Sequence, residues 1–389
     1  MTRPRPSPAA SGRVSAYGVG GLPKIAAGDD VAALVVGALR DAGESLADGD
    51  VVVVSSKVVS KAAGLVRSGH SREEVIEEQT VRVVAERVTP RGTTRIIETP
   101  CGVVLAAAGV DASNTEPGTV LTLPTEPDVD AENLRRRFAE LTGATVGVVI
   151  SDTAGRPWRD GQVDFALGAA GLLPLEDFRG ISDPFGNRLE VTQRAIVDEV
   201  AALADLVKGK VDGVPVAVVR GLDAFVSDTP GPGARALQRY GEADWFQFGH
   251  VEAVRAAIAV PAGSEGAEPP SVTGEPALTH LGRLLRVAWR SEDLRPPATS
   301  PTQWAMVNIG GDVDAREATG EPWPDRAGAY MVVKLHPDST AGDAVSMGAF
   351  VQRVLSLARA EGLQVQVQQV QSDGLVDDIF LYAYPLPGT

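Results

Sequence analysis

Short runs of β-branched residues alternate along the chain with longer stretches in which apolar residues recur every three or four positions. The runs typical of strands lie at residues 51–55, 94–99, 102–110, 147–152 and 214–221. The stretches with helical spacing lie at residues 31–43, 72–88, 131–143, 192–209 and 251–259. The first two thirds of the chain are therefore expected to mix helices and strands.

Capping residues mark two of the expected helix starts. Asp29 and Asp30 precede the helix at 31–43, and Asp is a preferred N-cap residue. Ser71 and Glu74 have the spacing of a capping box, which predicts the start of the helix at 72–88.

The composition changes after residue 259. Residues 260–276 are rich in Pro, Gly, Glu and Ser, which indicates a linker. Beyond it, amphipathic stretches at residues 278–289 and 344–362 and apolar runs at residues 329–336 and 378–386 predict a smaller α+β domain at residues 277–389. Residues 1–13 have the composition of a flexible tail, which leaves residues 14–259 as the main domain.

Overall composition narrows the class of protein. Hydrophobic residues make up 44% and charged residues 22% of the 389 residues, which is typical of a globular chain. The net charge of -15 argues against a nucleic-acid partner, because such a protein needs a basic face. The first residues lack the apolar segment of a signal peptide, and no apolar run is long enough to cross a membrane. The single cysteine excludes an internal disulfide. We therefore expect a cytoplasmic protein with no membrane partner.

Three polar segments follow apolar runs and are expected to be loops that carry chemistry. Hard oxygen ligands suit Mg²⁺ or Mn²⁺, while lysines and backbone amides suit phosphate oxygens, so together they predict a site for a nucleoside triphosphate. The candidate residues are Ser56, Lys57, Ser60 and Lys61; Asp111, Ser113 and Asn114; and Asp152, Thr153, Arg156 and Arg159.

Each segment also has a purely structural interpretation. An Asp after a strand often forms an Asx-turn, and Lys57 and Lys61 have the spacing of a solvated helix face. The two arginines could pair with Asp160 and Asp164, and Trp158 is expected to pack rather than to stack on a base. We favour the functional interpretation because independent turns need not gather their polar groups at apolar strand ends. Neither a P-loop nor G-x-G-x-x-G is present.

Several compound motifs occur together in one order. They are "GLPKI", "VVVVSSKVVSKAAG", "ETPCGVVLAAAGVDASNTEPG", "GVVISDTAGRPWRDGQVDFALGAAGL", "DPFGN" and "TQRAIVDEVAALADLVKGK". In this order they resemble the coenzyme F420-0:L-glutamate ligase family, the γ-glutamyl ligases of deazaflavin cofactor biosynthesis. The resemblance covers residues 14–259 and implies an α+β fold with a mixed sheet.

The resemblance implies an activity and a site. Such a ligase uses GTP and Mg²⁺ or Mn²⁺, with K⁺ as an additional cation, to attach L-glutamate to coenzyme F420-0 and then further glutamates through γ-linkages. It is expected to form an acyl phosphate, release GDP and phosphate, and act as a homodimer. Carried over by motif, the GTP site comprises Gly21, Leu22, Pro23, Lys24, Ser56, Lys61 and Asn114. The implied metal ligands are Asp111, Asp152 and Thr153, and we assign substrate binding to Arg156 and Arg159.

The last third of the chain leaves alternatives open. Actinobacterial relatives are often fused to a flavin-binding nitroreductase-like domain, and residues 296–311 and 342–363 faintly resemble parts of one. Because this region is short and has no Arg-Arg-Ser entry motif, we expect a degenerate nitroreductase-like domain rather than a working FMN reductase. The alternatives are a flavin-dependent oxidoreductase that reduces a dehydro-F420 precursor, and a non-catalytic GTP-binding module.

Overall fold

The computed structural model describes residues 12–90, 92–257, 277–289, 304–311, 329–335, 341–372 and 375–385. It divides the chain into two compact units, one formed by Met1–Val81 with Ile97–Asp244 and the other by Arg82–Ile96 with Trp245–Thr389. Most of the predicted tail and the whole predicted linker, residues 260–276, lie outside the described residues. The domain limits proposed from the sequence stay a prediction.

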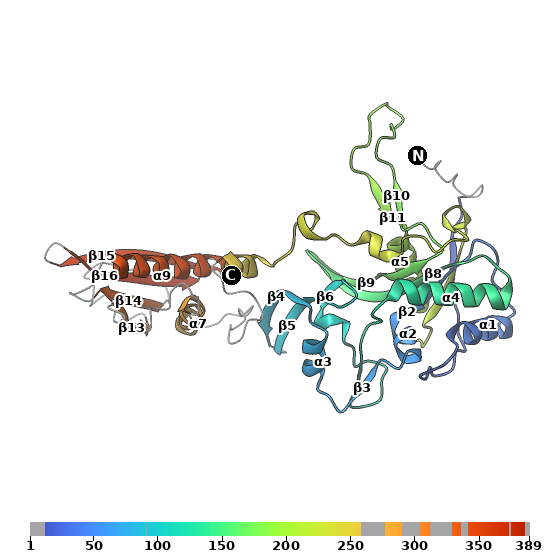
Figure 1. The fold of residues 1–389 in the computed structure, drawn as a ribbon, viewed down its shortest axis with the longest axis horizontal. Helices are drawn as coiled ribbons and strands as arrows, with labels where there is room; N and C mark the ends of the chain where they lie inside the picture. The colour runs from blue at the N-terminus through green and yellow to red at the C-terminus, as the bar shows by residue number, and fades with distance from the viewer. Residues whose placement is uncertain are drawn as a thin grey trace. The chain divides into compact units, whose positions relative to one another are not determined.

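A five-stranded mixed sheet forms the centre of the first unit, as Figure 1 shows. Its order is β1-β12-β2-β8-β9, in which β2 and β8 are parallel and the other neighbours are antiparallel. The strands are β1 (Ser15–Gly18), β2 (Val51–Ser55), β8 (Gly147–Arg156), β9 (Arg159–Ala170) and β12 (Val216–Arg220). Together with its helices, this sheet confirms the α+β class with a mixed sheet.

Helices cover both faces of the sheet because its strands are apolar on both sides. Val148 and Ile150 of β8 pack into a core with α1 (Val31–Asp41), α2 (Ser56–Ala62) and α4 (Pro127–Thr142). Val149, between them, packs on the opposite face against α5 (Ile196–Lys208). Successive side chains of β8 thus alternate between an α2 face and an α5 face, which later decides where each polar side chain lies.

Two sequence predictions are corrected here. The helix expected at 72–88 ends at Glu78, as α3 (Arg72–Glu78), and the chain continues as β4 (Arg82–Thr89), whose β-branched residues favour a strand. Residues 152–164, expected to be a loop, form most of a long β8–β9 hairpin, because the polar residues pair across strands instead of ending them. The predicted caps at Asp30 and Ser71 are both confirmed.

Shorter strands form further small sheets. β3 pairs with β7, β4 with β5, and β10 with β11, and the β10–β11 segment projects from the first unit in Figure 1. Their bounds, with β6, are β3 (Val66–Ser68), β5 (Gly92–Glu98), β6 (Val104–Ala106), β7 (Thr119–Leu121), β10 (Leu175–Asp177) and β11 (Gln193–Ala195).

The second unit contains an antiparallel sheet in the order β13-β14-β16-β15. Its elements are α6 (His250–Ala257), α7 (Ala277–Trp289), β13 (Trp304–Gly311), β14 (Ala329–Leu335), α9 (Ala341–Ala360), β15 (Leu363–Ser372) and β16 (Leu375–Pro385). Apolar side chains of α7 and α9 form its core. The sequence predicted α7, α9, β14 and β16 and missed β13 and β15. Its relation to a nitroreductase-like domain stays a prediction.

Membrane-crossing helices were sought throughout the described residues. None of the helices there combines the length and the apolar character that a membrane span requires.

Candidate functional site

The parallel pairing of β2 and β8 brings two predicted residues together. Ser55 lies opposite Ser151 in the register, so both strands pass the same edge of the sheet at adjacent positions. The next residue of one segment, Ser56, begins α2 and is buried, and it donates a hydrogen bond from Oγ to Oδ1 of Asp152 at 3.0 Å. The segment predicted as a loop at 55–61 is therefore a strand end followed by a helix.

Asp152 is partly buried at this edge. Burial raises the pKa of its carboxyl group to about 6, and the hydrogen bond from Ser56 opposes that rise only in part. A desolvated carboxylate is stabilised by a nearby cation. This side chain is therefore suited to meet a positively charged ligand.

The segment around Asp111 joins the start of α2 through a lysine. Lys57 Nζ lies 2.6 Å from Asp111 Oδ2 and donates to Ser113 Oγ at 2.6 Å. One turn further along α2, Lys61 donates to the carbonyl oxygen of Asn114 at 2.8 Å. Asn114 adopts φ 56°, in the left-handed region that Asn tolerates better than most residues. At least one residue from each of the three predicted polar segments thus lies at α2.

Three ammonium groups come close together at the same place. Burial lowers the pKa of Lys61, and the neighbouring charges of Lys57 and Lys24 lower it further. Lys24 follows Gly21, Leu22 and Pro23, whose chain turns at Gly21 with φ 77° while Leu22 packs against the core. We call Lys24, Lys57 and Lys61 the lysine trio. Its mutual repulsion makes it a place where a polyanion is favoured.

Thr153 points to the opposite side of β8 from Asp152. It lies directly across the hairpin from Asp164, to which its Oγ1 donates a hydrogen bond at 2.5 Å. Two lysines at the end of α5 complete this group: Lys208 lies 2.7 Å from Asp164 Oδ2, and Lys210 lies 2.9 Å from Thr153 Oγ1. The structure therefore places Asp111 and Asp152 with α2 and groups Thr153 with α5.

Asp205 also belongs to this group, because its Oδ1 lies 2.7 Å from Lys210 Nζ. Sequence reasoning did not single out Lys208, Asp205 or Asp164 as part of the site. Asp164 is buried, and although burial alone would raise its pKa, the charge of Lys208 and other donors bring it down to about 2. The sequence did contain a signal: the polar residues Ser151 and Thr153 alternate along one strand, and Asp164 lies on the next. Recognising it requires the register of the β8–β9 hairpin, and the prediction of a loop at this place excluded a hairpin.

Arg156 and Arg159 lie opposite each other at the end of the hairpin. Both are exposed, and among the described residues neither forms an ion pair, whereas Asp164 is paired with lysines instead. Trp158, between them, is 83% exposed and has φ 60°, which is unfavourable for a bulky side chain. Trp158 was expected to pack rather than to stack on a base, but most of its side chain is exposed, because it lies in the two-residue turn at the end of the hairpin.

The donor set fits a hard divalent cation. Mg²⁺ in nucleotide sites is commonly held by one or two carboxylates together with substrate phosphates, and Asp111 and Asp152 provide two. Within the described residues there is no group of three His, Cys, Asp or Glu side chains that could hold a metal by itself. Because Lys57 already occupies Asp111 Oδ2, a cation there would have to displace that ammonium.

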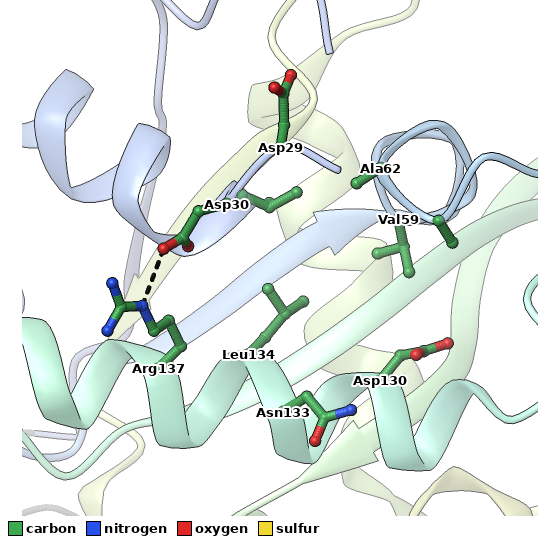
Figure 2. Close-up of a pocket in the computed structure, with 10 residues that line it drawn as sticks. Asp29, Asp30, Val59, Ala62, Asp130, Asn133, Leu134 and Arg137 are labelled. Atoms are coloured by element: carbon green, nitrogen blue, oxygen red, sulfur yellow. Dashed lines mark hydrogen bonds and ion pairs between the residues drawn. The ribbon is translucent and has the colours of Figure 1, made fainter. Parts of the chain in front are cut away.

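A cavity of about 290 Å³ lies beside this place but is distinct from it. Figure 2 shows that its lining comes from the start of α1, from α2 and from α4, and that Arg137 pairs with Asp30 at its edge. Three carboxylates line it, so a polyphosphate would be repelled there. The lining residues are Asp29, Asp30, Val31, Val59, Ala62, Ala63, Asp130, Asn133, Leu134 and Arg137. None of the predicted site residues is among them.

Comparison with known proteins gives consistent matches over more than half of the chain. A family model described as F420-0:Gamma-glutamyl ligase matches residues 21–221. The coenzyme F420:L-glutamate ligase of Methanothermobacter thermautotrophicus is 40% identical over 253 residues, which are 60% of this chain and 99% of that protein. The proteins of the same name from Archaeoglobus fulgidus and Halobacterium salinarum are 41% and 43% identical over 226 residues, covering 89% and 86% of their lengths.

Proposed function

Because the chain belongs to the F420-0:gamma-glutamyl ligase family, we propose that it joins L-glutamate to coenzyme F420-0 at the expense of GTP. The observation that carries the nucleotide assignment is the lysine trio beside Asp111 and Asp152. Positive charge for phosphate oxygens and carboxylates for a divalent cation occur together in nucleotide-dependent enzymes.

The lysine trio would bind the phosphate groups of GTP. Lys61 is held in place by its hydrogen bond to the Asn114 carbonyl, and the charge of Lys24, in the segment that begins at Gly21, acts on it. Gly21 has φ 77°, a conformation that glycine adopts readily, and backbone N–H groups of this segment would be further phosphate ligands. Lys57, once released from Asp111, would provide the third ammonium.

Asp111 and Asp152 would hold Mg²⁺ or Mn²⁺. When bound, the ion supplies Lewis-acid neutralisation of the phosphate charge. Ser56 positions the Asp152 carboxylate through the hydrogen bond to Oδ1. Thr153 belongs to the neighbouring group on the α5 face, and we do not assign it to the same ion as Asp152.

The reaction proceeds in two displacements. The acceptor carboxylate attacks the γ-phosphorus of GTP, and the bond to the β-phosphate oxygen breaks to release GDP and leave an acyl phosphate. The amine of L-glutamate then attacks the carbonyl carbon, phosphate leaves and the amine loses its proton. Arg156 and Arg159 are exposed at the hairpin tip, and their guanidinium groups would bind carboxylates of the substrates.

The test follows GDP release and product mass when the full chain is given GTP, Mn²⁺, L-glutamate and coenzyme F420-0. We expect a mass gain of one glutamyl residue, coupled to one GDP, and its loss in Asp152→Asn. The matched control is Asp198→Asn, another half-buried carboxylate, which accepts a hydrogen bond from the Ala166 backbone on β9 at 2.9 Å.

Each outcome separates the ligase from its alternatives. Product formation that survives Asp152→Asn would contradict the assigned site. GTP binding without product would indicate a non-catalytic GTP-binding module, and a bound yellow chromophore would direct attention to the flavin alternative.

A further inference from the structure

The ammonium group of Lys210 is surrounded by oxygen atoms from three segments of the chain. Its Nζ lies 2.7 Å from Asp205 Oδ1, 2.9 Å from Thr153 Oγ1 and 3.2 Å from Asp164 Oδ1. An ammonium has three N–H donors and no acceptor, so these three contacts use its whole hydrogen-bonding capacity. We call Thr153, Asp164 and Asp205 the oxygen triad.

The ammonium group of Lys210 is held in the oxygen triad although much of its side chain is exposed to solvent. The side chain of Lys210 is 55% exposed, and an unrestrained lysine at such a position would keep its charged end in water. Instead, each of its three N–H donors is directed to an oxygen atom of the protein, from Thr153, Asp164 or Asp205. The oxygen triad therefore binds this ammonium more favourably than water does.

The local chain is built to bring two lysines to one carboxylate. Gly209 separates Lys208 from Lys210 and has φ 65°, so the chain leaves α5 in a conformation that other residues rarely adopt. A Cβ at Gly209 would lie 2.2 Å from Asp212 Oδ2. With this turn, Lys208 reaches Asp164 Oδ2 and Lys210 reaches Oδ1.

Charge balance shows what the Lys210 ammonium does. Lys208 and Lys210 together neutralise Asp164 and Asp205, so removing Lys210 would leave one negative charge on two carboxylates and a hydroxyl. Those are the hard oxygen ligands that divalent cations select. We propose that Lys210 is a built-in cation, a positioning residue that fills the oxygen triad and keeps divalent ions out of it.

The consequence concerns the residue next to Asp152. Thr153 Oγ1 donates to Asp164 and accepts from Lys210, so its hydroxyl group is fixed without any bound ion. The β8 strand that carries Asp152 is thus anchored on the α5 face by a side chain of the protein itself. The inference goes beyond the proposed ligase reaction and does not depend on it.

The test counts Mn²⁺ ions bound to the full-length protein by electron paramagnetic resonance, with no nucleotide or coenzyme present. We expect Lys210→Ala to bind one more Mn²⁺ per chain than the unmodified protein, with a dissociation constant of about 10⁻⁴ to 10⁻³ M, as for exposed oxygen-ligand sites. The additional ion should disappear in Lys210→Ala/Asp205→Asn. Lys210→Met, which keeps the aliphatic stem, serves if the alanine variant is unstable.

A control distinguishes a specific site from a change in net charge. Arg179→Ala also removes one cation, from an exposed pair with Asp177 on the β10–β11 segment, and should leave the number of bound ions unchanged. An unchanged Mn²⁺ count in both Lys210 variants would overturn the proposal, as would an additional ion that persists without Asp205. Because the count needs no ligase substrate, a protein lacking ligase activity would still decide it.

Discussion

Ser56 Oγ and Asp152 Oδ1 lie 3.0 Å apart although 96 positions separate the two residues in the chain. The contact exists because β2 and β8 are parallel neighbours in which Ser55 lies opposite Ser151. The residues that follow these two serines, Ser56 and Asp152, therefore lie side by side at the same edge of the sheet. It joins the first residue of α2 to a carboxylate whose charged form is disfavoured by burial.

Cation binding at Asp152 is expected to depend on pH. Burial raises the pKa of this carboxyl group from 3.8 to about 6, so the folded state binds the additional proton in this range. The free energy of unfolding therefore falls as pH rises from about 4 to 6. A cation must displace that proton, so Mn²⁺ affinity should fall about tenfold per pH unit below pH 6.

Mn²⁺ titrations between pH 5 and 7.5 test this dependence. Ser56→Ala removes a hydrogen bond that lowers the pKa of Asp152, so its loss of affinity should begin at a higher pH. An affinity that is constant between pH 5 and 7 would contradict the assignment of this carboxylate.

Lys61→Met is expected to weaken GTP binding about 10- to 100-fold, because a charge-assisted hydrogen bond to a phosphate contributes about 1.5–3 kcal/mol. Isothermal titration calorimetry at fixed salt measures the change. Arg179→Met removes an exposed cation on the β10–β11 segment and should leave the affinity unchanged. Equal losses in the two variants would indicate a general charge effect and no local phosphate site.

Gly168→Ala should destabilise the first unit by about 1–3 kcal/mol through overpacking. A Cβ at this position of β9 would lie 2.3 Å from the carbonyl oxygen of Pro127 at the start of α4, where the backbone has little room to move. Gly155→Ala on the same hairpin is the control, because its Cβ would meet nothing within 4 Å. Urea denaturation compares them, and equal midpoints would show that α4 does not press on β9.

Ser71→Ala should loosen α3 by about 1 kcal/mol, since it removes the side chain that accepts from the Glu74 backbone N–H and ends the capping box. Amide hydrogen exchange of Arg72–Glu78 should then quicken about fivefold. Ser68→Ala on exposed β3 provides the comparison, and unchanged exchange in α3 would mean that the cap contributes nothing measurable.

The sequence predicted the elements whose signals are local. Ser71 and Glu74 could be interpreted from spacing alone, and the β-branched run at 51–55 gave its strand. The candidate residues Ser56, Lys61, Asp111 and Asn114 were also recognisable, because short polar residues after apolar runs and the family motifs agreed.

What the sequence could not provide was register. Asp152 and Thr153 are neighbours in the chain and were both expected to be metal ligands, yet strand geometry sends their side chains to opposite faces. The hairpin itself was missed because Asp164 and the polar residues before it resemble a loop in composition. The contact of Lys210 with Thr153 depends on how α5 and the turn at Gly209 pack against β8, which the sequence does not show.

The parallel register of β2 and β8 also limits how the length of this chain can vary. One residue inserted within β8 before Asp152 would exchange the two faces, turning Asp152 toward α5 and Thr153 toward α2. Residues added between Arg156 and Arg159 would lengthen the turn beyond the paired strands and leave both faces as they are. Insertions and deletions are therefore compatible with the tip of the hairpin and incompatible with the strand that precedes it.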